Sequence, residues 1–101
     1  MKLITNEMKK ILPGIKETEE AADPIAHVKL FHPMSSYTVY ITEYDPTSRV
    51  AFGLVCGAGD SPELGYLNIR ELEEMKVMGL KMERDMFYKA EKLSEIRKRG
   101  Y

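Results

Sequence analysis

A chain of 101 residues, 44% of them hydrophobic and 31% charged, has the size and composition of one soluble protein, so we expect a single globular domain over residues 1–101. Its formal net charge of −1 excludes a chain-wide basic field for nucleic acid and an acidic surface that mimics DNA. The single cysteine, Cys56, excludes an intramolecular disulfide and a multi-cysteine metal site, and we expect it to be a small buried hydrophobe.

The first predicted element is a short helix. Apolar residues at positions 3, 8, 11 and 12 suit one helix face, Thr5 or Asn6 can cap its start, and Pro13-Gly14 ends it. Neither this segment nor any later one has the apolar run of a signal peptide or the roughly 18 apolar residues of a membrane span. We therefore expect a cytoplasmic protein without membrane contact.

An acidic segment follows the helix and runs to Pro24. It holds Glu17, Glu19, Glu20 and Asp23. Such a run can bind a cation or a basic partner, or it can be a solvated loop held open by charge repulsion; we favour the loop.

Residues 25–31, 37–44, 50–56 and 63–69 predict four strands of an antiparallel meander, since they are rich in the β-branched and aromatic types that suit a half-buried pleated surface. The segment 45–48 supplies a turn through its Asp, Pro and Ser residues. A regular second strand would place Glu43 on the same face as Val39 and Ile41, with Tyr40 and Tyr44 on the opposite face.

Two glycines interrupt these strands, Gly53 in the third and Gly65 in the fourth. A glycine inside a strand usually marks a bulge or a close approach of another backbone. We therefore expect the sheet to curve at these two positions, or the neighbouring strand to come close to Gly53.

The C-terminal part predicts two more helices and a fifth strand. Asn68 can cap a helix that opens near Ile69, with Gly79 as its end. Residues 80–88 alternate like an edge strand, and residues 90–101 favour a helix. The fold class is thus α+β: about five antiparallel strands in a curved sheet, packed on one face by two or three short helices.

The last helix carries a cluster of cations, Arg97, Lys98 and Arg99. Cations at a helix C-terminus interact favourably with the helix dipole, which gives them a structural role. A contact with nucleic acid or with a partner is the alternative role.

Five carboxylates fall at or near predicted strand ends: Glu43, Asp45, Glu63, Glu83 and Asp85. Converging carboxylates can hold Mg²⁺ or divide acid and base roles, as a metal-dependent hydrolase requires. Arg84 is expected to form an ion pair with Glu43 or Glu63 across the strands.

No complete catalytic or cofactor-binding set accompanies these carboxylates. His27 and His32 lack the further ligands of a zinc site, and no phosphate-binding, dinucleotide-binding or nucleophile-elbow motif is present. We therefore predict no catalytic residues, no metal and no cofactor. Tyr37, Tyr40, Tyr44 and Tyr66 lie in the meander; we expect at least half of them in the core, and any exposed one marks an interface.

The chain resembles the family catalogued as domain of unknown function 2958, small proteins carried by bacterial plasmids, phages and integrated elements. The resemblance rests on segments that span nearly the whole chain in the expected order: Thr18-Glu19, Asp23-Pro24-Ile25, Val28-Lys-Leu-Phe31, Tyr40-Ile-Thr-Glu-Tyr-Asp45, Phe52-Gly-Leu-Val55, Glu63-Leu-Gly-Tyr66, Glu71-Leu-Glu73, Gly79-Leu80, Glu83-Arg-Asp85 and Leu93-Ser-Glu-Ile96. It implies a mobile-element accessory protein and carries over no activity or site residue.

We favour a non-enzymatic module that binds a macromolecular partner, a protein rather than a nucleic acid, and leave the oligomeric state open. The expected surface joins the polar and aromatic residues at strand ends: Glu43, Asp45, Glu63, Tyr66, Glu83, Arg84 and Asp85. Two alternatives stay open. One is a single-stranded nucleic-acid-binding module that uses the sheet tyrosines and Arg97, Lys98 and Arg99. The other is a carboxylate–metal hydrolase or nuclease.

Overall fold

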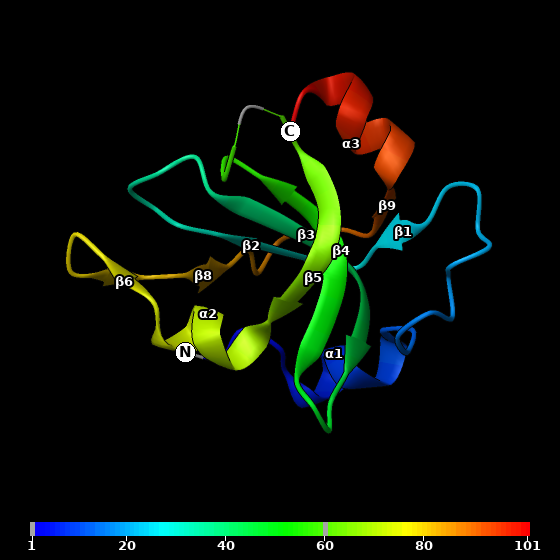
Figure 1. Ribbon diagram of the computed structural model, residues 1–101, viewed down its shortest axis with the longest axis horizontal. Helices are drawn as coiled ribbons and strands as arrows, with labels where there is room; N and C mark the ends of the chain where they lie inside the picture. Colours follow the sequence, from blue (N-terminus) through cyan, green and yellow to red (C-terminus); the bar gives the residue numbers. More distant parts are fainter. Residues whose placement is uncertain (1, 60) are drawn as a thin grey trace.

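A computed structural model describes residues 2–59 and 61–101, and its centre is a five-stranded antiparallel sheet in the order β5-β4-β3-β2-β8 (Figure 1). The sheet is open, and three short helices accompany it, so the predicted α+β class is confirmed. The strands of this sheet are β2 (Val28–Phe31), β3 (Thr38–Asp45), β4 (Val50–Cys56), β5 (Glu63–Asn68) and β8 (Glu83–Arg84).

Two small two-stranded ladders lie outside the main sheet. In one, β1 (Ile25–Ala26) pairs with β9 (Glu91–Lys92); in the other, β6 (Lys76–Val77) pairs with β7 (Leu80–Lys81). The helices are α1 (Asn6–Ile11), α2 (Ile69–Glu74) and α3 (Leu93–Arg99). None of the helices in the described part of the chain is long and apolar enough to cross a membrane.

The predicted caps of the first two helices are present. The Thr5 hydroxyl accepts from the Met8 N–H at 3.2 Å, and the Asn68 side chain accepts from the Glu71 N–H at 3.2 Å. Each cap satisfies one of the free N–H groups of a first helical turn. Helix α2 nevertheless ends at Glu74 and not at Gly79, as we had expected.

The prediction of one strand over residues 80–88 is wrong. Residues 76–81 instead form the β6–β7 hairpin, whose two central residues, Met78 and Gly79, have φ of 55° and 79°. Positive φ at both central residues is the signature of a type I′ hairpin turn, which fits the twist of its flanking strands. The hairpin takes up residues 80–81, and only β8 remains to pair with β2.

Helices pack on both faces of the sheet, not on one face as predicted. On one face, Leu3 and Leu12 beside α1 and Ile69 and Leu72 of α2 pack in one core cluster with the strand residue Leu30 and its neighbours. On the other face, Leu93 and Ile96 of α3 pack in a second cluster with Ala26, Tyr40, Leu54 and Cys56. We call these the closed face and the α3 face. The burial predicted for Cys56 is confirmed.

A β-bulge in β3 changes which face its last residues occupy. Ile41 pairs with Gly53 of β4. Glu43, two residues further along β3, pairs with Phe52, which is only one residue away from Gly53 in β4. The extra residue reverses the alternation, so Glu43 joins Phe52 on the α3 face and Tyr44 joins the closed-face cluster. The faces predicted for Glu43 and Tyr44 were therefore wrong, because a regular strand was assumed.

Gly53 lies opposite this bulge at a close backbone approach. A Cβ atom on Gly53 would lie 2.1 Å from the Tyr40 carbonyl oxygen, so no other residue fits there. This confirms the predicted close approach. At Gly65 the register between β4 and β5 is unbroken and a Cβ would meet no atom within 4 Å, so packing there does not require glycine.

Candidate functional site

The seven residues predicted as one interaction surface do not form one site. Glu43 and Tyr66 line the same hollow on the α3 face, whereas Arg84 and Asp85 line another hollow beside the opposite edge of the sheet. Glu83 precedes Arg84 in β8 and pairs with Phe31 of β2. Glu63 begins β5 next to a third hollow, and Asp45 holds the β3–β4 turn by accepting from the Thr47 N–H at 3.0 Å. Of these hollows, the one that Glu43 and Tyr66 share has an aromatic floor and a wall held by hydrogen bonds.

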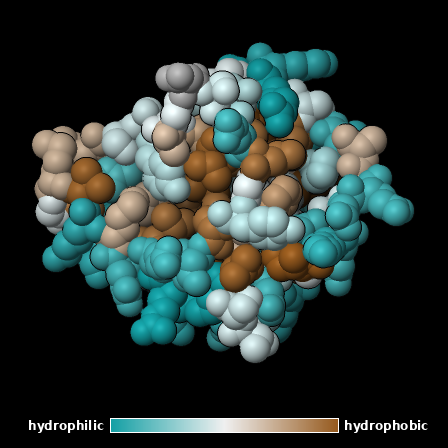
Figure 2. Space-filling model, viewed as in Figure 1, coloured by the Kyte–Doolittle hydropathy of each residue, from teal (hydrophilic) through white to brown (hydrophobic). Residues whose placement is uncertain are grey.

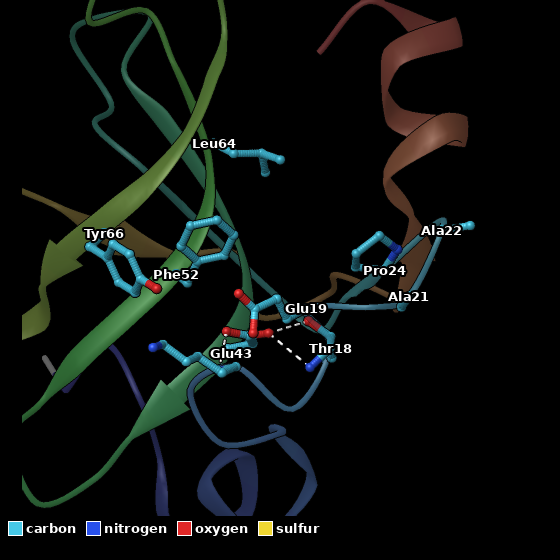
Figure 3. A pocket seen from close by; sticks show the side chains of 10 residues that line it. Thr18, Glu19, Ala21, Ala22, Pro24, Glu43, Phe52, Leu64 and Tyr66 are labelled. Atoms are coloured by element: carbon cyan, nitrogen blue, oxygen red, sulfur yellow. Dashed lines mark hydrogen bonds between the residues drawn. The ribbon is translucent and has the colours of Figure 1, made fainter.

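This hollow, of about 280 Å³, has an aromatic floor (Figure 3). The rings of Phe52 and Tyr66, a cross-strand pair, lie with their centres 4.8 Å apart at an angle of 59°. Tyr66 is 59% exposed and Leu64, two residues before it in β5, is 47% exposed. The wall opposite β5 is the loop 16–24, and the lining is Lys16, Thr18, Glu19, Ala21, Ala22, Pro24, Glu43, Phe52, Leu64 and Tyr66.

Glu43 braces one end of this loop. Its side chain is only 3% exposed, and its carboxylate accepts from the Lys16 N–H at 2.8 Å, from the Thr18 N–H at 2.9 Å and from the Thr18 hydroxyl. Lys16 has a left-handed backbone with φ of 72°, which the bond to Glu43 holds in place. Both carboxylate oxygens are thus occupied, so Glu43 shapes the wall of the hollow.

Asp23 fixes the other end of the loop to α3. Its carboxylate accepts from the Ser94 N–H at 3.0 Å and from the Ser94 hydroxyl at 2.5 Å. These two hydrogen bonds, the hydroxyl bond foremost, lower the pKa of Asp23. The Leu93 N–H also donates to the Pro24 carbonyl at 3.0 Å. The loop 16–24 is therefore a braced wall. The acidic segment is a loop as predicted, but hydrogen bonds to Glu43 and Asp23 hold it, and not charge repulsion.

A second hollow, of about 400 Å³, continues the first along the same wall. The two share Ala22, Pro24 and Leu64, and the second extends to Arg97 of α3. We call the two together the groove. Figure 2 shows hydrophobic surface gathered over the middle of β4 and β5, with hydrophilic residues around it.

The groove is suited to binding and carries no reactive set. Its floor is apolar, its exposed charges are Lys16 and Glu19 near one end and Arg97 at the other, and the Glu43 carboxylate is already satisfied. Within residues 2–59 and 61–101, no three His, Cys, Asp or Glu side chains converge as a metal site would need. The arrangement can hold an apolar side chain between the aromatic floor and the loop wall.

The predicted ion pair of Arg84 is replaced by another contact. Its guanidinium donates to the Lys2 carbonyl, and it reaches neither Glu43 nor Glu63. Asp85 accepts from the Phe87 N–H at 3.0 Å in a local turn. Phe87 is 91% exposed beside this turn.

The basic tail is partly engaged within the protein. The Arg99 guanidinium forms a bidentate ion pair with Glu91. The hydrogen bonding between the two side chains raises the pKa of Arg99 and lowers the pKa of Glu91. Arg97 lines the groove, and Lys98 is exposed. Two of the four meander tyrosines, Tyr40 and Tyr44, are fully buried, which confirms the expectation that at least half lie in the core.

Sequence reasoning missed three groove residues, Phe52, Leu64 and Pro24. Leu64 and Tyr66 alternate on a strand with few other apolar residues on that face, a pattern that could have marked them as a pair. The contribution of Pro24 depends on where the loop 16–24 folds, and no sequence signal indicates that.

The fold and the groove define a small α+β protein with an open antiparallel sheet and one partly uncovered face. The chain belongs to the family described as Protein of unknown function (DUF2958), whose model matches residues 3–98. This confirms the resemblance seen in the sequence and adds no activity to it. Neither the curated proteins nor the solved structures contain a significant match.

Proposed function

We propose that this protein is a non-enzymatic interaction module and that its groove binds an apolar side chain presented by a partner protein. The observation that carries the proposal is the exposed floor of the groove. Phe52, Leu64 and Tyr66 lie on a part of the α3 face that α3 leaves uncovered, next to a wall fixed at both ends. Exposed apolar groups in a preformed hollow are typical of binding sites.

The charges at the groove favour a protein over a nucleic acid. Lys16, Glu19 and Glu43 line the hollow in which a base would have to stack on Phe52 and Tyr66, so one cation stands against two carboxylates and the hollow offers phosphate no net attraction. Arg99, one of the three cations proposed for nucleic acid, is held by Glu91. Binding through stacked bases and the basic tail is therefore the weaker proposal.

A role in mobile genetic elements and a cytoplasmic location complete the proposal. The first rests on the family resemblance alone. The genes on either side of this one give the most direct check of the first, since genes for plasmid transfer or phage functions are expected there.

The binding proposal can be tested with a display library of random dodecapeptides selected on the folded protein. We expect selected peptides to be rich in aromatic and large aliphatic residues and to lose binding to Tyr66→Ser and to Leu64→Ser. Ile11→Ser is the matched control, because Ile11 is an equally exposed apolar residue on α1. Peptides that bind all three variants equally well, or no enrichment at all, would contradict the proposal.

A further inference from the structure

Strand β5 forms an open edge of the main sheet next to the groove. Among the described residues β5 pairs only with β4, over all six of its residues from Glu63 to Asn68. In an antiparallel strand half of the backbone N–H and C=O groups point away from the paired neighbour. These groups are free to pair with another strand, whatever its side chains are.

The two edges of the sheet differ in how they are protected. At the other edge β8 is only two residues long, which leaves little backbone to pair. The middle of β5, from Leu64 to Leu67, has no charged residue, no proline and no register shift against β4. Edges are usually blunted by such features, and β5 has only Glu63 at its first position.

From this edge, resting on the proposed function above, we propose that the partner contributes an extended segment that pairs with β5 as a sixth strand. Backbone pairing of this kind holds a peptide by its main chain, while alternate side chains provide specificity. Residues opposite Leu64 and Tyr66 lie on the groove side, within about 5 Å of these side chains at the Cβ atoms. Apolar residues at two positions separated by one residue therefore fit the edge.

The charge of Glu63 adds a further requirement on the segment. Glu63 is exposed and makes no ion pair within residues 2–59 and 61–101. It directly precedes Leu64, so the partner residue opposite Glu63 adjoins the residue opposite Leu64. A lysine or arginine there meets the carboxylate, since opposite charges on facing strand positions attract. The partner segment thus has two apolar residues separated by one residue, and a cation next to the apolar residue that lies opposite Leu64.

The dodecapeptide selection tests this pattern. We expect selected sequences to carry the alternating apolar pair with an adjoining Lys or Arg, and selection on Glu63→Lys to exchange that cation for Asp or Glu. Glu71→Lys, which places the same charge on exposed α2, is the control and keeps the cation. Apolar residues spaced by three or four positions, as on a helix, would overturn strand pairing and leave groove binding intact.

Methylation of the peptide backbone separates the two proposals further. N-methyl groups placed one at a time along the best peptide are expected to weaken binding about tenfold or more at alternate positions and little between them. Equal effects at all positions overturn strand pairing even if Tyr66→Ser still abolishes binding. Sedimentation of the free protein tests whether a second copy of this chain occupies the β5 edge instead. A dimer that Gly65→Pro converts to monomer would assign the edge to that second copy and overturn the proposal of a partner segment.

Discussion

The two faces of the sheet are built from similar apolar residues but differ in how fully these residues are buried. On the closed face, α2 and the residues that flank α1 pack on Leu30 and its neighbours, which are buried. On the α3 face the helix is only seven residues long and covers one part, and Leu64 and Tyr66 remain exposed beside it. The extent of helix packing therefore separates residues that stabilise the fold from residues that are available for contact, although both groups belong to strands of the same sheet.

Two glycines that pair with each other across β4 and β5 compare a position closed off by a neighbouring backbone with an open one. Gly53→Ala is expected to destabilise the protein by about 3 kcal/mol or more, because its Cβ would lie 2.1 Å from the Tyr40 carbonyl oxygen and force β3 and β4 apart. Gly65→Ala meets no atom within 4 Å and should leave stability unchanged or raise it by up to about 1 kcal/mol. Urea denaturation of both variants measures the difference. Similar losses in the two would contradict the register between β3 and β4.

Two leucines on opposite faces compare the faces with the same chemical change. Leu30→Ala removes a fully buried side chain from the closed-face cluster and should cost about 2–5 kcal/mol. Leu64→Ala, at a half-exposed position in the groove, should cost less than about 1 kcal/mol. Chemical denaturation followed by circular dichroism measures both. A large loss for Leu64→Ala would mean that the groove floor belongs to the core.

The wall of the groove is tested at Glu43. Glu43→Gln replaces a carboxylate that accepts three hydrogen bonds by an amide with one accepting oxygen, and should cost about 1.5–3 kcal/mol. Hydrogen exchange of the amides of Lys16 and Thr18 should speed up, because these N–H groups lose their acceptor. Glu63→Gln, an exposed carboxylate on β5, is the control and should leave exchange unchanged. Unchanged protection in Glu43→Gln would show that the loop is held by other contacts.

The architecture could be predicted from local patterns, and the site could not. The cap signals and the three strands at the centre of the meander are written in neighbouring residues, such as Asn68 and Glu71, and the structure has them. The single strands expected over 25–31 and 80–88 are each divided between two sheets. The face occupied by Glu43 depends on a bulge, and a bulge depends on the packing of two strands rather than on either sequence alone. The position of Pro24 across from Leu64 depends on contacts between segments about 40 residues apart, and periodicity carries no information on these.

The smallest expected effect is a loss of stability in acid, which depends on two carboxylates, one on each face of the sheet. On the closed face Glu73 accepts from the Leu3 N–H at 3.1 Å and from Arg49 at 2.7 Å; burial raises the pKa of Glu73, and these hydrogen bonds and the Arg49 charge lower it by more. On the α3 face the pKa of Asp23 is lowered by Ser94. Since both folded-state pKa values are depressed, each carboxylate stabilises the fold above its unfolded pKa, about 4.3 for Glu and 3.9 for Asp.

That stability is lost as the pH falls through the folded-state values. Denaturation of the wild type at pH 7, 5 and 3 should therefore show a loss between pH 5 and 3 that shrinks in Glu73→Gln. It should shrink less in Asp23→Asn, because Asp23 sits in the more open contact and water screens it. If Asp23→Asn removed more of the acid sensitivity than Glu73→Gln, the contact of the groove wall with α3 would stabilise the protein more than the Glu73 contact of the closed face. The contrast between a closed and an open face would then be reversed at this loop.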